Sequence, residues 1–152
     1  MWTGSAASPA DVTGAATRAR AAFRPWPRTS LAGRETRLRA FAATLESRRA
    51  SLTDAISREV GKPTWEALTE VTSMISQIEL SITAHPHRCA DFAGAPALTR
   101  FRPLGVVTVF GPFNFPGHLP KGRIVPARFA GNTVVFKPSE HAPLMAEVMT
   151  TA

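Results

Sequence analysis

Two short apolar runs do most to limit the fold of this chain. VVTVF (106–110) and TVVFK (133–137) are rich in β-branched residues and nearly continuous in apolar character, as strands buried inside a parallel sheet are. Between them lie a helix-compatible segment, 118–130, and a turn at Gly131 and Asn132. This order predicts a βαβ unit with a right-handed crossover, the start of a doubly wound sheet. Because two strands leave both sheet edges open, the predicted sheet is incomplete.

The first part of the chain has the three- and four-residue apolar spacing of helices instead. Helices are predicted over about 9–23, 31–45, 50–60 and 64–84. Ser8, Ser30 and Thr64 are the predicted N-caps, and Gly61 is a predicted helix stop. Residues 97–104 alternate apolar and polar side chains, which predicts an exposed antiparallel strand. The fold class is therefore α/β: one domain, 1–152, with a helical part (1–96), an exposed strand (97–104) and the start of a parallel sheet (105–152).

Candidate site residues follow the two predicted parallel strands. Ligands of open α/β sheets bind beyond the carboxyl ends of the strands, and here FGPFNFPG (110–117) and KPSE (137–140) lie at those ends. Lys137 and Glu140 offer a donor and an acceptor that suit the two hydroxyls of a ribose. Asn114 places a neutral amide at the tip of the first loop. The chain contains neither GxGxxG nor GxxxxGK[ST], so the usual phosphate-loop signatures are missing.

Each of these residues also has a purely structural interpretation, which the sequence leaves open. Asn114 can cap a helix that begins near Pro116. Lys137 can be a solvated lysine at a strand end. Ser139 can cap the following helix, with Glu140 in its first turn.

Charge, histidines and the single cysteine favour no further class of function. The net charge of +7 is spread along helices and interleaved with acidic residues, so nucleic-acid binding is not favoured. His85, His87 and Cys89 are too few for a metal site, and Pro86 is expected to exclude a helix there. Cys89 has no neighbour in sequence that would lower its pKa, so it is not favoured as a nucleophile. Without an expected signal peptide, membrane span or internal disulfide, the cytoplasm is the expected compartment.

RPLGVVTVFGPFNFPGHLPKGRIVPARFAGNTVVFKPSE (102–140) resembles the NAD(P)-dependent aldehyde dehydrogenase superfamily. Upstream, ARAAFRPW (19–26) and LESRRASLTDAISREVGKPTWEALTEV (45–71) resemble the family's first helix and the helices around its GKP turn. GHLP, IVPA and AGNTVVFKPSE are most similar to the succinylglutamate-semialdehyde dehydrogenases of bacterial arginine catabolism. The resemblance implies an enzyme that oxidises a small aldehyde to a carboxylate with NAD, as a homo-oligomer without nucleic-acid or membrane partners.

The resemblance also implies roles for individual residues. Asn114 matches the family asparagine whose amide helps form an oxyanion hole, where a neutral donor stabilises developing negative charge. Lys137 and Glu140, with Ser139 between them, match the segment that holds the adenosine ribose. A carboxylate at position 140 would accept from the ribose 2′-hydroxyl and repel a 2′-phosphate, which predicts NAD over NADP. Four residues match backbone that borders the cofactor: Phe110, Gly111, Pro112 and Phe113.

Several features depart from the family pattern. The nucleophilic cysteine and the general-base glutamate of such proteins lie beyond position 152, so the chain is expected to be an inactive internal piece lacking both ends. The family helix is usually apolar at the position of Arg128, and the subfamily usually has other residues at the positions of Lys121 and Arg123. Arg128 is expected either to disturb packing or to extend to the surface. The alternative to an enzyme fragment is a non-catalytic nucleotide-binding or interaction module.

Overall fold

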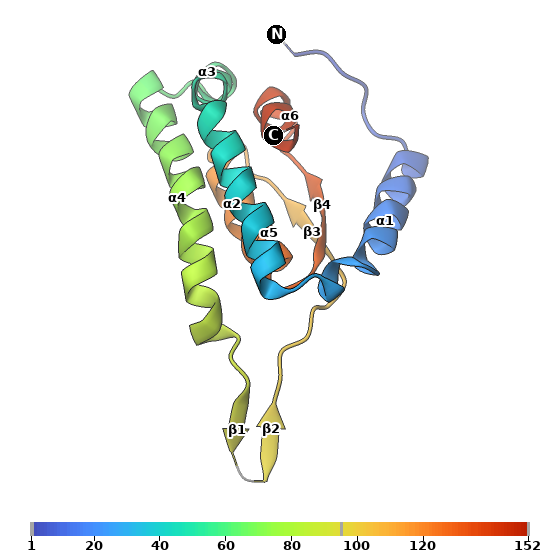
Figure 1. Cartoon of the computed structure of the whole chain (residues 1–152). Coiled ribbons are helices and arrows are strands. Elements are labelled where there is room, and N and C mark those ends of the chain that lie inside the picture. The colour runs from blue at the N-terminus through green and yellow to red at the C-terminus, as the bar shows by residue number, and fades with distance from the viewer. Residues whose placement is uncertain (1, 95, 152) are drawn as a thin grey trace.

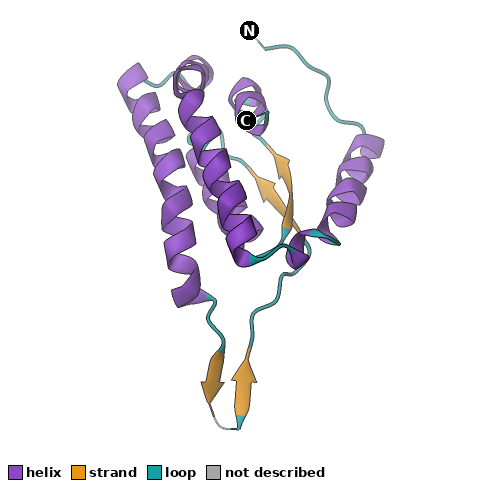
Figure 2. Ribbon diagram, in the orientation of Figure 1, coloured by secondary structure: helices purple, strands orange, loops and turns teal. Residues whose placement is uncertain are grey.

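The computed structural model describes residues 2–94 and 96–151, and it has the α/β arrangement that the sequence predicts (Figure 1). Figure 2 shows that helices make up most of the chain, with two small separate pairs of strands. The elements are α1 (Pro9–Phe23), η1 (Trp26–Arg28), α2 (Leu31–Ser47), α3 (Arg49–Val60), α4 (Thr64–Arg88), β1 (Phe92–Gly94), β2 (Ala97–Thr99), β3 (Val106–Phe110), α5 (His118–Phe129), β4 (Thr133–Lys137) and α6 (Pro143–Thr150).

Strands β3 and β4 pair in parallel, and α5 connects them, so the predicted βαβ unit is confirmed. The register runs from Val106 opposite Thr133 to Phe110 opposite Lys137. Helix α5 packs on both strands from the side of the helical layer, and α1 contacts both from the other side (Figure 1). Burial of these strands is less complete than expected: in β3 only Val109 is buried, because no further strand adjoins the pair among the described residues.

The hydrophobic core lies among the helices, where α5 is packed between the sheet and the layer formed by α2 and α4. Helix α3 packs against both α4 and α6. Apolar side chains from these five helices form one buried cluster, which includes Leu45, Ile56, Val71, Ile78, Val125 and Met145. The helical layer therefore fixes the position of the two helices that follow the strand ends.

Three of the four predicted helix ends are confirmed. Ser8 and Asp11 form a capping box at α1, and the Ser30 hydroxyl accepts from the Gly33 N–H at 3.1 Å. Gly61 ends α3 with φ of 77°, a left-handed conformation that glycine adopts without strain. The prediction for Thr64 was wrong, because Pro63 occupies the N-cap of α4 and supplies no side-chain acceptor.

Helix α4 extends further than the sequence predicts. Pro86 lies inside its last turn, so the expectation that this proline excludes a helix was wrong. The helix is still closed there, since the Cys89 N–H donates to the His85 carbonyl at 2.8 Å. A hairpin of β1 and β2 follows and projects from the helical body (Figure 1). The exposed strand predicted over 97–104 is real but covers only Ala97–Thr99, and its partner β1 was not predicted.

Among the described residues, none of the helices has both the length and the apolar character needed to cross a lipid bilayer.

Candidate functional site

The two loops predicted to form a site lie side by side at the carboxyl ends of β3 and β4. Phe110 pairs with Lys137 in the sheet register, and the Gly111 N–H donates to the Lys137 carbonyl at 2.9 Å. Further out, the rings of Phe113 and His141 lie 6.1 Å apart in an edge-to-face arrangement. The segments 110–113 and 137–141 therefore form one continuous surface at the sheet edge where α/β proteins bind ligands.

Gly111 allows the first loop to approach β4 closely. A Cβ atom added at this position would lie 3.0 Å from Cε2 of Phe136 and 3.5 Å from the Cα atom of Pro138. Any larger residue would therefore require the Phe136 ring to shift, whereas the contact with Pro138 would be an ordinary one. Beyond this contact the side chains of Phe110 and Phe113 are exposed, which leaves two aromatic faces beside the polar residues.

Lys137 and Glu140 form an exposed ion pair, with Nζ 3.0 Å from Oε2. The pKa of the Glu140 carboxyl lies below its ordinary value because its own backbone N–H donates to it, and because Lys137 donates to it as well. Glu140 therefore presents a carboxylate to solvent beside an ammonium group. This pair offers the acceptor and the donor that a vicinal diol requires.

The structural interpretations of Asn114 and Ser139 were wrong. The N-cap of α5 is Gly117, and among the described residues the exposed Asn114 side chain makes no hydrogen bond. The N-cap of α6 is Ala142, so Glu140 does not lie in that helix's first turn. Ser139 instead accepts from the N–H of His141 at 3.2 Å, which tightens the loop after β4.

A glutamate from α4, and not Asn114, accepts hydrogen bonds from the first N–H groups of α5. Oε1 of Glu70 accepts from the N–H groups of Gly117 and His118, at 3.1 and 3.2 Å, where α5 begins. Oε2 of the same carboxylate lies 2.7 Å from Nζ of Lys62. Sequence reasoning missed this residue because Glu70 is distant in sequence and its spacing within α4 only marks it as a helix residue.

Helix α6 begins against a second glutamate, which sequence reasoning also missed. The Glu59 carboxylate, from the end of α3, accepts from the N–H of Leu144 at 2.7 Å and from the N–H of Met145 at 2.8 Å. Both helices that follow the strand ends thus receive a negatively charged acceptor, α5 from α4 and α6 from α3. Such an acceptor satisfies free N–H groups and interacts favourably with the helix dipole.

Cys89 lies away from the strand-end loops. It follows α4 and lines a hollow beside Phe129 and Ala130, at the far end of α5 from Asn114. A helix of this length spans about 18 Å, which separates the thiol from the amide. His85 packs edge-to-face on Phe129 at 4.8 Å, and burial lowers its pKa. The described residues contain no group of three histidine, cysteine or acidic side chains that could hold a metal ion.

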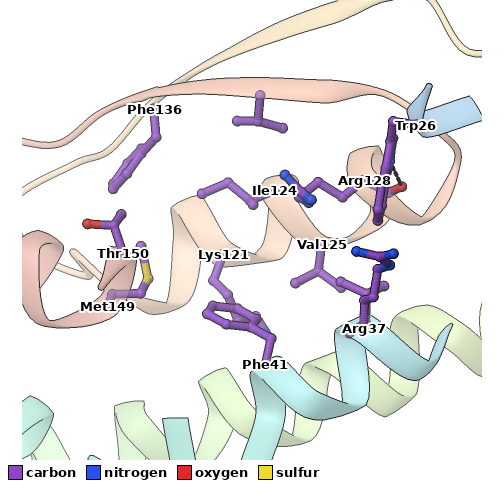
Figure 3. A pocket seen from close by; sticks show the side chains of 12 residues that line it. Trp26, Arg37, Phe41, Lys121, Ile124, Val125, Arg128, Phe136, Met149 and Thr150 are labelled. Carbon is purple, nitrogen blue, oxygen red and sulfur yellow. Dashed lines mark hydrogen bonds between the residues drawn. The ribbon is translucent and has the colours of Figure 1, made fainter. Parts of the chain in front are cut away.

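A cavity of about 310 Å³ lies on another side of the βαβ unit, between α2, α5, β4 and α6 (Figure 3). Arg128 is half-buried there, with its guanidinium carbon 4.6 Å from the Trp26 ring, and Trp26 Nε1 donates to the Arg128 carbonyl at 2.9 Å. Arg128 therefore packs on an aromatic face, and α5 keeps its place in the core. The stem of the buried Lys121 also lines this cavity. None of the predicted site residues does.

The fold and the paired strand-end loops define an α/β protein of the doubly wound class, with an exposed polar and aromatic surface at the carboxyl edge of its sheet. The chain belongs to the aldehyde dehydrogenase family, whose profile matches residues 1–152.

Individual relatives agree with this membership. N-succinylglutamate 5-semialdehyde dehydrogenase of Erwinia tasmaniensis is 49% identical over 148 residues, which cover 97% of this chain and 30% of the relative. The enzyme of the same name from Escherichia coli O9:H4 is 51% identical over 153 residues, covering 98% and 31%. The chain thus spans about three tenths of the length of these curated relatives.

Solved structures share the fold. NADP-dependent glyceraldehyde-3-phosphate dehydrogenase from Bacillus halodurans C-125, complexed with NADP, superposes with a TM-score of 0.85 at 31% identity, covering 95% of this chain and 33% of that one. Lactaldehyde dehydrogenase from Escherichia coli superposes with a TM-score of 0.86 at 28% identity, covering 93% and 31%.

Proposed function

We propose that this chain is the nucleotide-binding part of an NAD-dependent dehydrogenase that oxidises N-succinylglutamate 5-semialdehyde, a step of arginine catabolism. The observation that carries the proposal is the exposed pair of Lys137 and Glu140 beside Phe110 at the carboxyl edge of a parallel sheet. Family membership and the names of the relatives that are about half identical support the reaction and the substrate. A bound nicotinamide would supply the hydride acceptor.

Lys137 and Glu140 are proposed to hold the adenosine ribose. Both side chains are more than half exposed, at 56% and 72%, so a ligand can reach them without rearrangement of the core. Lys137 would donate to one hydroxyl and Glu140 would accept from the other. Glu140 is ionised at neutral pH, since its pKa lies below an ordinary value that is already acidic, and its carboxylate would repel a 2′-phosphate. The proposed cofactor is therefore NAD, although the related glyceraldehyde-3-phosphate dehydrogenase was solved with NADP.

Asn114 is proposed to donate its side-chain amide to the oxyanion formed from the aldehyde. The amide is exposed and makes no hydrogen bond among the described residues, so it remains available for a ligand. An amide donor does not titrate, and it stabilises negative charge most effectively when its position is fixed before the reaction.

The attacking thiol is proposed not to be Cys89. The length of α5 separates this residue from Asn114, whereas a nucleophile and its oxyanion donor must reach the same carbonyl group. We therefore expect the 152-residue chain to bind nucleotide without oxidising the aldehyde. This position of Cys89 equally supports the second candidate, a non-catalytic nucleotide-binding module.

Calorimetric titration with NAD+ and with NADP+ tests the proposal. Wild type is expected to bind NAD+ more tightly, and Glu140→Gln is expected to lose at least half of that preference. Asp91→Asn is a matched control, because Asp91 forms a similar exposed ion pair with Arg100, at 3.0 Å, in the distant hairpin. The assignment of the ribose site would be rejected if wild type bound NAD+ and NADP+ equally tightly and Glu140→Gln did the same.

A turnover assay followed by complementation separates the two candidates. The aldehyde, NAD+ and the chain are mixed, and absorbance of the reduced nicotinamide is followed. Turnover that is lost in Cys89→Ala would contradict the proposed exclusion of Cys89. Binding without turnover in the chain fits both candidates. They are then separated by adding the remaining two thirds of a relative as a second polypeptide, since only an enzyme part is expected to regain oxidation.

A further inference from the structure

Glu70 is a buried carboxylate with three donors. Its side chain is only 1% exposed, and it accepts from Lys62 Nζ at 2.7 Å and from the N–H groups of Gly117 and His118 at 3.1 and 3.2 Å. Burying a charge is unfavourable unless it is paired and hydrogen-bonded, and Glu70 meets both conditions. Hydrogen bonds to a charged group are also stronger than neutral ones. The start of α5 is therefore held firmly to α4.

Lys62 extends this connection to the loop before α5. Its Nζ atom, which pairs with Glu70, also lies 3.5 Å from the centroid of the Phe115 ring. The Lys62 side chain is only 10% exposed. The attraction between an ammonium group and an aromatic face is stronger when the ammonium is shielded from water. One ion pair thus holds Phe115 through the cation and Gly117 through the carboxylate.

Asn114 directly precedes this held segment. Its own side chain has no partner among the described residues, so nothing in its immediate contacts fixes its direction. The backbone on one side is joined to β4 through the Gly111 N–H, and on the other side it is held through Phe115 and Gly117. The conformation of the loop tip is then determined by its two anchored ends.

We infer that Glu70 and Lys62 are positioning residues, which hold the loop so that the backbone of Asn114 keeps a fixed position at the carboxyl edge of the sheet. The inference rests on the proposed oxyanion role of Asn114. Neither Glu70 nor Lys62 touches a reacting group. They act through residues 115–118, and they limit the positions from which the side chain of Asn114 can reach an oxyanion.

Amide hydrogen exchange and ¹⁵N relaxation of the labelled chain test the inference without any nucleotide. Glu70→Gln is expected to accelerate exchange at Gly117 and His118 by about tenfold or more, as expected when a charged acceptor is replaced by a neutral one. The order parameter of the Asn114 backbone N–H is expected to fall from about 0.85 toward 0.6. Amides of the core, such as Ile78, are expected to keep their protection.

Two further variants make the result decisive. Lys62→Met removes the cation without changing α4, and it is expected to lower the Asn114 order parameter as well. Glu66→Gln is the matched control, because this glutamate also faces Lys62, at 3.8 Å, but its side chain is 41% exposed and, among the described residues, forms no ion pair or hydrogen bond with residues 115–118. It is expected to change exchange by less than about twofold.

The inference is rejected if Glu70→Gln and Lys62→Met leave the order parameter of Asn114 unchanged. It is also rejected if they accelerate exchange equally throughout the core, since that would indicate a general structural role. Failure of the proposed function is recognised separately, by the absence of nucleotide binding in wild type while the loop still responds to Glu70→Gln. If Glu70→Gln does not fold, the result for Lys62→Met decides.

Discussion

Lys121 of α5 donates its Nζ to the backbone carbonyl of Met74 in α4. The side chain is completely buried, and among the described residues no carboxylate forms an ion pair with it. Burial lowers the pKa of Lys121 from 10.5 to about 7. The folded chain therefore resists protonation of this lysine, whereas the unfolded chain accepts the proton readily.

The first prediction is that this lysine makes stability depend on pH. Because the folded pKa is about 7 and the unfolded value is 10.5, the unfolded chain binds more protons between these values. The free energy of unfolding therefore rises with pH through this window. Relative to Lys121→Met, the wild type is expected to gain roughly 4 kcal/mol between about pH 7 and pH 10. Urea melts across this range measure the difference.

Arg123→Met is the control for this measurement, since Arg123 lies on the same helix but is exposed. It is expected to show the same pH dependence as wild type. A constant difference between wild type and Lys121→Met from pH 6 to pH 10 would mean that Lys121 keeps its ordinary pKa in the folded chain.

The second prediction compares two asparagines at opposite ends of α5. Asn132 is buried: its Oδ1 accepts from Leu104 N–H at 2.7 Å and Gly105 N–H at 3.0 Å, and its Nδ2 donates to Ala127 at 3.1 Å. Asn132→Ala leaves both N–H groups without this acceptor and is expected to cost about 3 kcal/mol of stability. Thermal and urea unfolding of the variant measure this loss.

Asn114→Ala is the matched change at the other end of the helix. Its side chain is exposed and makes no hydrogen bond among the described residues, so stability is expected to change by less than about 0.5 kcal/mol. Equal losses in the two variants would show that Asn114 has a structural role after all, and the proposed availability of its amide would then fail.

The third prediction concerns the start of α6. Glu59→Ala removes the acceptor for the N–H groups of Leu144 and Met145, and it is expected to destabilise the chain by about 1 kcal/mol. Hydrogen exchange should accelerate first in α6. Asp54→Asn changes an exposed carboxylate of α3, the helix that also carries Glu59, and it is expected to have almost no effect. Comparable losses in both variants would argue against this contact.

Local patterns predicted much of the fold. The β-branched runs around Val107 and Val134 correctly identified both parallel strands, and Ser8, Ser30 and Gly61 correctly identified three helix ends. These features depend on residues close together in sequence. The acceptors at α5 and α6 do not, because Glu70 and Glu59 reach them only after the helices have packed.

The same limit explains the errors at the candidate site. Asn114 and Ser139 have the residue types of N-caps, but Gly117 and Ala142 occupy those positions, and distant glutamates satisfy the helix N–H groups. Proximity of the two loops was predictable, since parallel strands end at one edge. The assignment of the ribose pair and of the oxyanion donor stays a prediction that requires a bound ligand.

The most direct test of the proposed function is to titrate NAD+ into the ¹⁵N-labelled chain and to map the chemical shift changes. The proposal predicts changes concentrated in residues 110–113 and 137–140, with saturation, and a markedly smaller response in the double variant Lys137→Met/Glu140→Gln. Absence of any saturable change would contradict the proposal. So would changes confined to the cavity around Trp26 and Phe41, because nucleotide would then bind away from the strand ends.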